Sequence, residues 1–279
     1  MNLQIFMQKS DITIAFVVFK PKISLLETLI LKFYNKYPII IVNNSEEQLD
    51  NFLYDYKNVK IIDLKKNIGN GAGINYCLKI CNTNMIIYMD IDVEFNNKNF
   101  AKLLKYSKKI NNFGVLIPNS KKGVESKIKK RWDVEGAILL FNKKNLQNMR
   151  FDENFFLYFE ENDLFFNCLK NKINVIFLPK VTYVHRRATS IDEKKLQKPN
   201  KLKQLREWHY MWSYYYFYKK NFGVLFSLKK SFKLFFNDCL MFFFYLITLN
   251  YNSMFLRYSR ISGLLTSIMN LKAIKRLKK

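Results

Sequence analysis

The segment Met85-Ile86-Ile87-Tyr88-Met89-Asp90-Ile91-Asp92 is an apolar run that ends in two aspartates one residue apart. Side chains alternate between the two faces of an extended strand. Asp90 and Asp92 are therefore expected on the same side, just beyond a strand that is buried on both faces. Aspartate is also common in the turns that follow strands. The alternative to an ordinary turn is a pair of carboxylates that share one divalent cation.

The distribution of the acidic residues favours a cation site. The chain has 47 Lys and Arg against 22 Asp and Glu, which gives a formal net charge of +25. Nevertheless, 8 of the 22 acids fall within residues 90–94 and 152–163. Carboxylates that gather in an otherwise cationic chain indicate a site that needs negative charge, and a hard cation bound through oxygen atoms is the simplest reason.

Apolar segments with strand character follow one another along the first two thirds of the chain, and helical patterns lie between several of them. Apolar strands that alternate with helices are typical of an α/β fold with a mostly parallel, Rossmann-like central sheet flanked by helices. Residues 1–200 are therefore predicted to form one domain and residues 201–279 a helical extension. The predicted strands are residues 13–19, 38–42, 59–64, 85–89, 113–118, 134–141, 174–179 and 181–185.

Polar residues and glycines gather at the carboxyl ends of these strands, where α/β sheets bind their ligands. The glycines of residues 69–75 could be a truncated dinucleotide fingerprint. They follow the third strand rather than the first and lack its final spacing, which disfavours a nicotinamide enzyme. The candidates at the strand ends are Phe19, Asn43, Asn44, the loop 69–75, Asp90 and Asp92.

The second group of acids follows an aromatic run at residues 155–159 and consists of Glu160, Glu161 and Asp163. Acids in a first helical turn favour the helix dipole and need no catalytic role, so both interpretations stay open. His185 is one of only two histidines and ends a strand pattern. A lone histidine is more often structural than a ligand, but here it joins the other candidates.

Taken in order, these features resemble glycosyltransferase family 2, which consists of inverting nucleotide-sugar transferases with the GT-A fold. The similarity runs from about Thr13 to His185 and is nearest to a rhamnosyltransferase-like bacterial branch. The matching residues are Ile41-Val42-Asn43-Asn44-Ser45 for a strand ending in Asp-Asn-x-Ser, Asn67-Ile68-Gly69 with Gly73-Ile74-Asn75 for an Asn-x-Gly and Gly-x-Asn segment, Asp90-Ile91-Asp92 for the Asp-x-Asp metal motif, and residues 155–164 for Phe-Phe-Leu-Tyr-x-Glu-Asp-x-Asp-Leu.

The resemblance implies a catalytic base that takes the proton from an acceptor hydroxyl in a single inverting displacement. Glu161 is the best candidate, with Glu160 and Asp163 as alternatives, because Glu161 stands where the family usually has Asp. Mg²⁺ or Mn²⁺ is expected on Asp90, Asp92 and His185, where it would neutralise the departing diphosphate. The nucleotide-sugar donor is expected on Phe19, Asn43, Asn44, Asn67, Gly73, Asn75 and Asp90.

The acceptor implied by the resemblance is a glycan or a lipid-linked sugar in cell-surface polysaccharide biosynthesis. Residues 201–279 mix aromatic residues with lysines, which predicts helices that associate peripherally with an anionic membrane surface. The apolar run 239–249 is shorter than the roughly 20 residues of a membrane span.

The absence of CxxC pairs and of a signal-peptide pattern predicts a cytoplasmic protein on the inner face of the cell membrane. The alternative, a non-catalytic basic protein that binds nucleic acid or membranes, leaves the clustered acids unexplained.

Overall fold

The computed structural model describes residues 11–120, 127–187, 189–195, 199–273 and 275–276. The chain forms two compact units. The first contains the residues up to Ile68 together with Ala72–Phe151 and Leu164–Asp192, and the second contains Gly69–Gly71, Asp152–Asp163 and Glu193–Lys279.

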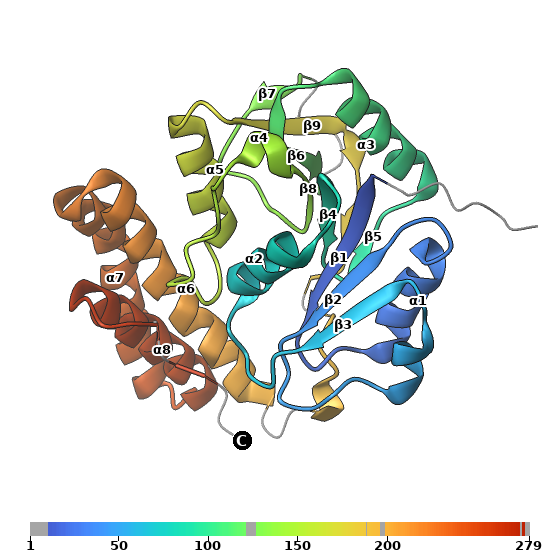
Figure 1. Cartoon of the computed structure of the whole chain (residues 1–279). Coiled ribbons are helices and arrows are strands. Elements are labelled where there is room, and N and C mark those ends of the chain that lie inside the picture. The colour runs from blue at the N-terminus through green and yellow to red at the C-terminus, as the bar shows by residue number, and fades with distance from the viewer. Residues whose placement is uncertain (1–10, 121–126, 188, 196–198, 274, 277–279) are drawn as a thin grey trace, which may run out of the picture. The chain divides into compact units, whose positions relative to one another are not determined.

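The first unit is built around an eight-stranded sheet with the order β3-β2-β1-β4-β8-β6-β9-β7 (Figure 1). Strands β1 to β4 are mutually parallel, β8 is antiparallel to both of its neighbours, and β6 is parallel to β9. A second sheet pairs β5 with β10 in antiparallel fashion. The bounds are β1 Ile12–Val18, β2 Ile39–Asn43, β3 Val59–Asp63, β4 Met85–Met89, β5 Val93–Glu94, β6 Phe113–Asn119, β7 Lys129–Lys130, β8 Ile138–Asn142, β9 Asn174–Thr182 and β10 Val184–His185.

Helices cover both faces of the large sheet because its strands are apolar on both sides. Ile14 and Phe16 of β1 pack with α1 and α3, while the intervening Ala15 packs with α2 and α5 on the opposite face. Figure 1 shows α1 and α3 on one side of the sheet and α2 on the other. The bounds are α1 Ile23–Phe33, α2 Asn70–Ile80, α3 Asn97–Lys109, α4 Lys143–Leu146 and α5 Glu160–Lys170, with 3₁₀ turns at Asn51–Asp55 and Glu193–Lys195.

This architecture confirms the predicted α/β class with a mostly parallel central sheet. Three predicted strands differ from the observed ones by more than one residue at an end. Pairing of β8 begins only at Ile138, because the preceding residues form a loop in which Glu135 turns toward His185. The segments predicted as two strands, 174–179 and 181–185, form β9 and β10. β9 continues past Pro179 because the pairing register shifts there. Proline has no N–H to donate, and the shift leaves it without a ladder position that would need one.

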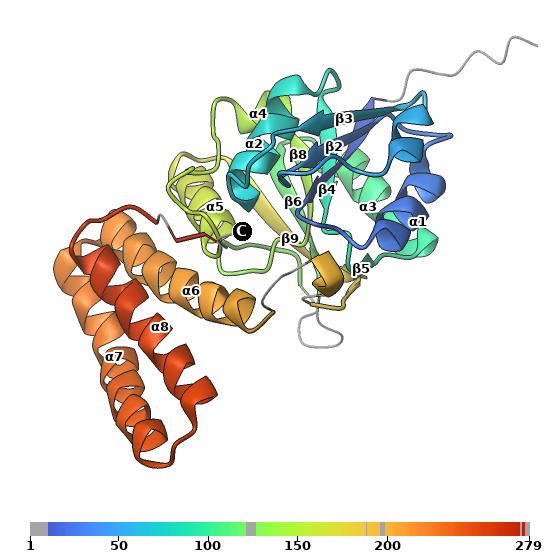
Figure 2. The ribbon, with the colours of Figure 1, turned by 90° about the horizontal axis from the view of Figure 1, so that it is seen from below.

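The second unit contains three long helices, α6 Pro199–Phe222, α7 Val224–Ile247 and α8 Tyr251–Ile268, and confirms that the C-terminal part is helical. In Figure 2, α7 and α8 run side by side and are joined by a short turn. α6 contributes the buried Trp208, Met211, Trp212 and Tyr215 to the interior of this unit. Within the described ranges, no helix combines the length and the apolar character that crossing a membrane requires.

Candidate functional site

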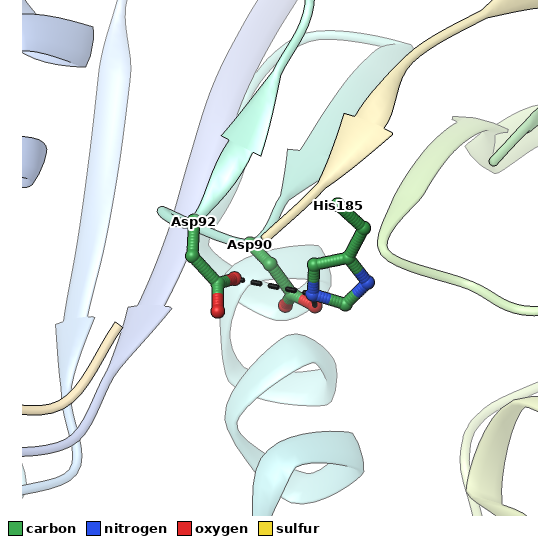
Figure 3. A group of neighbouring side chains, drawn as sticks. All are labelled: Asp90, Asp92 and His185. Atoms are coloured by element: carbon green, nitrogen blue, oxygen red, sulfur yellow. Dashed lines mark hydrogen bonds and ion pairs between the residues drawn. The ribbon is translucent and has the colours of Figure 1, made fainter. Parts of the chain in front are cut away.

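Asp90, Asp92 and His185 converge at the carboxyl end of β4 (Figure 3). The two aspartates lie in the turn between β4 and β5. Their histidine partner arrives from a distant part of the chain because β10 pairs with β5, which places His185 opposite Val93. His185 Nε2 lies 3.2 Å from Asp92 Oδ1 and 3.8 Å from Asp90 Oδ2. One ligand atom from each residue lies within 4.8 Å of the others.

Neighbouring groups hold both aspartates in place. Asp92 is buried, and its Oδ2 accepts a 3.2 Å hydrogen bond from the backbone N–H of Thr189. The Tyr88 hydroxyl, two residues before Asp90 on the same side of β4, donates to Asp90 Oδ1. The backbone N–H of Asp90 donates to Ala137 O at 2.9 Å, which ties the turn to the start of β8. These bonds limit the rotation of both carboxylates, as a preformed binding site requires.

Glu135 completes the group from the opposite side of the imidazole and was missed by the sequence analysis. Its Oε1 lies 2.7 Å from His185 Nδ1, and its Oε2 accepts from Arg187 at 3.0 Å. A carboxylate on Nδ1–H fixes the tautomer and directs Nε2 toward the two aspartates. The signal that could have revealed it is an acid directly before the apolar run that forms β8.

Opposite charges at close range dominate the electrostatics of this group. Burial by itself lowers the pKa of His185, but hydrogen bonds to Asp92 and Glu135 outweigh it and raise that pKa to about 10. The hydrogen bond from His185 lowers the pKa of Glu135 to about 2 against the effect of burial. Burial raises the pKa of Asp92, yet its bonds to His185 leave it below the ordinary value. Both carboxylates are therefore anionic at neutral pH.

The donor set fits a divalent cation. Two carboxylates and one imidazole nitrogen offer two hard oxygen ligands and one nitrogen ligand on one side of an otherwise buried turn. Glu135 supplies the outer hydrogen bond that a metal-bound histidine commonly makes. The three residues predicted as metal ligands are thus brought together in one place.

Asn43, predicted to bind the nucleotide, is fully buried at the end of β2 and is held by its own neighbours. Its side-chain amide donates to Asp63 Oδ1 at 2.6 Å and to Glu47 O at 2.8 Å, and its Oδ1 accepts from the Ser45 N–H at 2.9 Å. Tyr54 donates to the other Asp63 oxygen at 2.6 Å. A linked polar network therefore forms at the ends of β2 and β3.

The remaining nucleotide-binding candidates in the first unit lie around the same strand ends. Asn44 is buried and Phe19 is half-buried. A Cβ atom on Gly73 would lie 2.5 Å from the Val17 side chain, so glycine permits this close approach of α2 to β1. Asn75 exchanges two 2.9 Å hydrogen bonds with the backbone of Phe151. Asn67, before Gly69, is half-buried. Their role in nucleotide binding stays a prediction.

The second acid group lies at the start of α5, as predicted, and its three members have different surroundings. Glu160 and Asp163 are buried, whereas Glu161 is half-buried. Asp163 Oδ2 accepts from Lys220 Nζ at 2.7 Å and its Oδ1 accepts from Asn221 at 2.8 Å. Lys220 also reaches Asp152 Oδ2 at 2.8 Å. Sequence gave no sign of Lys220, because it is one of many lysines.

The turn that leads into this acid group is backbone-strained. Tyr158 and Phe159 both adopt left-handed conformations, with φ of 68° and 65°. Such conformations are uncommon for bulky side chains. The rings compensate by packing on α6: Phe159 lies 5.6 Å from Phe217 and Tyr158 lies 5.8 Å from Tyr210, between ring centroids. The direction in which Glu160 and Glu161 leave the turn is set by this pair.

Comparison with known proteins places the chain in a family. The sequence model of glycosyl transferase family 2 matches residues 23–165. Among solved structures, the mannosyltransferase PcManGT from Pyrobaculum calidifontis, in complex with GDP-Man and Mn²⁺, superposes with a TM-score of 0.54 at 11% identity over 93% of this chain and 87% of that chain. TarS 1–349 of S. aureus, in complex with UDP, gives 0.52 at 14% identity over 93% and 90%.

A search of curated protein sequences found no match. The two structural likenesses concern the fold, which they identify as the GT-A type. The family model covers slightly more than half of the chain. The matched region contains both acid groups, while His185 at the end of β10 lies beyond it. The chain therefore belongs to glycosyl transferase family 2.

Proposed function

We propose that this protein transfers a sugar from a nucleotide-sugar donor to a glycan or lipid-linked acceptor, with inversion at the sugar carbon and with the help of Mg²⁺ or Mn²⁺. The observation that carries the proposal is the convergence of Asp90, Asp92 and His185 within 4.8 Å at the carboxyl end of a parallel strand. Ligands bind at this edge of α/β sheets. The structural relatives were solved with GDP-Man and Mn²⁺ and with UDP, which is consistent with a nucleotide donor.

The residues of the metal group divide the work between binding and orientation. Asp92 and His185 would hold the cation, and Asp90 would hold it or the donor ribose. With a cation bound, Glu135 would keep the proton on His185 Nδ1, and Nε2, which gives up its own proton, would present its lone pair. A divalent cation bound there supplies positive charge to the departing diphosphate. The chain itself contributes a fixed arrangement that needs little rearrangement when the glycosidic bond breaks.

Glu161 is our choice for the general base. Asp163 has both oxygens bonded to Lys220 and Asn221, and Glu160 is buried. Glu161 is half-buried, so its carboxylate can meet an acceptor hydroxyl. It would take the hydroxyl proton as the acceptor oxygen attacks the anomeric carbon from the side opposite the diphosphate, which inverts that carbon. Glu160 and Asp163 remain the alternatives.

The donor site, the acceptor and the location complete the proposal. Phe19, Asn43, Asn44, Asn67, Gly73 and Asn75 are proposed to line the nucleotide. The proposed acceptor belongs to cell-surface polysaccharide assembly on the cytoplasmic face of the membrane, and the rhamnosyltransferase-like branch is the proposed position within the family.

Binding of nucleoside diphosphates tests this proposal directly. UDP and GDP are titrated calorimetrically into the protein with and without Mn²⁺, and at least one is expected to bind only with the metal. Asp92→Asn should abolish this dependence, whereas Glu94→Gln, an exposed acid two residues away, should preserve it. Metal-independent binding, or unchanged binding by Asp92→Asn, would remove Asp92 from the site.

A further inference from the structure

Helix α7 presents large apolar side chains to the outside and small or polar ones to the interior of its unit. Its buried residues include Ser227, Ser231 and Asp238. Its exposed side chains include Leu225, Phe232, Phe236, Leu240, Phe243, Phe244 and Ile247, with Ile247 80% exposed and Phe243 59% exposed. This reverses the usual pattern of a helix in water, in which the apolar stripe faces the core. An exposed apolar surface of this kind marks an interaction site.

Polar contacts and small residues hold the three helices together. The buried Asp238 of α7 accepts from Arg257 at 2.7 Å and from Arg260 at 2.8 Å, and Arg260 also pairs with Glu207 of α6 at 2.7 Å. On α8 the buried Ser259, Gly263 and Ser267 recur every four residues. Helices that associate in lipid use small residues and polar bonds in the same way, because lipid does not drive apolar side chains inward.

The end of α7, the turn after it and the start of α8 form a long stretch without charged residues. Residues 239–256 contain no Asp, Glu, Lys or Arg. Leu249 in the turn, and Tyr251 and Phe255 in the first turns of α8, are exposed. From Cys239 to Ile247 the helix extends about 12 Å, at 1.5 Å per residue. The hydrocarbon layer of one leaflet is about 15 Å thick, half of the bilayer core. The uncharged end of the hairpin therefore fits within the depth of one leaflet.

Three lysines border the apolar surface. Lys229, Lys230 and Lys233 are exposed in the first half of α7, between the end of α6 and the uncharged residues. With the hairpin end in a leaflet, these lysines would lie near the level of the lipid phosphates, where each cation adds to the attraction. A symmetric contact with a second copy would instead bring these lysines together in a chain that already carries +25. Charge complementarity thus favours an anionic membrane.

We propose that the end of the α7–α8 hairpin, residues 239–256, inserts into one leaflet of an anionic bilayer, with Lys229, Lys230 and Lys233 against the phosphates. Only the biological purpose of this insertion rests on the proposed function: it would bring the enzyme to a lipid-linked acceptor. The inference deepens the expected peripheral association by naming the inserted segment and its depth.

Vesicle flotation of the full chain tests the inserted segment. Wild type is expected to float with vesicles of phosphatidylcholine and phosphatidylglycerol. In the triple variant Phe243→Ser, Phe244→Ser and Ile247→Ser, the fraction of protein that floats with the vesicles should fall about tenfold or more, because three apolar side chains no longer enter the leaflet. The control replaces three exposed apolar residues of the first unit, Leu31→Ser, Phe52→Ser and Ile128→Ser, and should float like wild type.

Three further measurements make the result decisive. Phe243→Trp should add fluorescence that lipids brominated along their acyl chains quench. Equal flotation of the hairpin variant and wild type, or absence of quenching, would overturn the proposal. So would a wild type that does not float and sediments as a dimer that the hairpin variant converts to a monomer. Mn²⁺-dependent UDP and GDP binding without vesicles is expected to be the same in wild type and hairpin variant. Its absence from wild type would count against the proposed function alone.

Discussion

Glu135 sets the orientation of His185 through a single hydrogen bond of 2.7 Å to Nδ1. Without this carboxylate the imidazole can rotate, and its neutral form can carry the proton on Nε2, the nitrogen that faces Asp90 and Asp92. Removing an outer partner of a metal-binding histidine typically weakens metal affinity by about 10- to 100-fold. Glu135, which would not touch the cation, would therefore control how well the proposed site holds it.

The first prediction concerns the loss of this partner. Glu135→Ala is expected to weaken Mn²⁺ binding by about 10- to 100-fold, measured by electron paramagnetic resonance in the absence of nucleotide. Glu135→Gln should retain most of the affinity, because its amide oxygen still accepts from Nδ1–H. An alanine variant that binds Mn²⁺ as tightly as wild type would show that His185 is positioned by other contacts.

The second prediction concerns the catalytic base. Glu161→Gln should reduce sugar transfer by about 10²- to 10⁴-fold while leaving donor binding unchanged, because the amide cannot accept a proton at neutral pH. Transfer and binding are measured separately, by product formation and by calorimetry. Asp163→Asn serves as the comparison: its bonds to Lys220 and Asn221 favour a structural role, so thermal unfolding should change more than the rate per folded molecule. Normal turnover by Glu161→Gln would transfer the role to Glu160 or Asp163.

Residue patterns singled out three side chains that the structure brings together, because each stands at a place that a strand pattern defines. Asp90 and Asp92 end an apolar run, and His185 ends another. Glu135 and Lys220 escaped prediction because their contacts span 50 and 57 residues and depend on how loops and helices meet. No local period encodes such contacts.

At the scale of elements, the approach of α6 to α8 depends on one missing side chain. A Cβ atom on Gly263 would lie 2.2 Å from the carbonyl oxygen of Trp208, and a backbone atom cannot move aside cheaply. The strands were predictable because apolar runs of five to seven residues mark them directly. The helical extension was predictable as helix, but its inverted burial was not, since composition does not say which face a helix turns inward.

The third prediction tests this contact. Gly263→Ala is expected to lower the free energy of unfolding by about 1–3 kcal/mol, the usual cost of overpacking, because α8 must shift away from α6. Urea unfolding followed by circular dichroism measures it. Leu265→Ala, an exposed position on the same helix, should change stability by less than about 0.5 kcal/mol. Equal stability of Gly263→Ala and wild type would mean that the two helices are not so closely packed.

For the molecule as a whole, acid pH removes favourable charge in several places at once. Glu135, Asp92 and Asp152 all have pKa values below their ordinary ones. Burial raises the pKa of Asp152, but the hydrogen bonds from Lys220, Asn154 and Tyr216 and the charge of Lys220 together outweigh it. A group whose pKa is lower in the folded state stabilises the fold above its ordinary pKa and loses this effect as pH falls toward the folded value. Protonation of acids also increases a net charge that is already +25.

The fourth prediction follows from these shifts. Without metal, the free energy of unfolding should fall steadily as pH drops from about 4.5 to about 2, the range between the ordinary and folded pKa of Glu135. Urea unfolding at several pH values measures it. Glu135→Gln should be less stable at pH 6 and show a shallower decline. A decline of the same steepness in that variant would assign the acid sensitivity to other carboxylates.

Tyr158 and Phe159 carry a consequence for how this chain can change during evolution. Each holds a left-handed backbone that glycine or asparagine would adopt with less strain, yet each ring packs on α6. A mutation to glycine at either position relieves strain and opens a gap at the same time. Accepted substitutions at these two positions should therefore appear together with compensating changes at Tyr210 or Phe217. The turn and the helix should thus change together in related sequences.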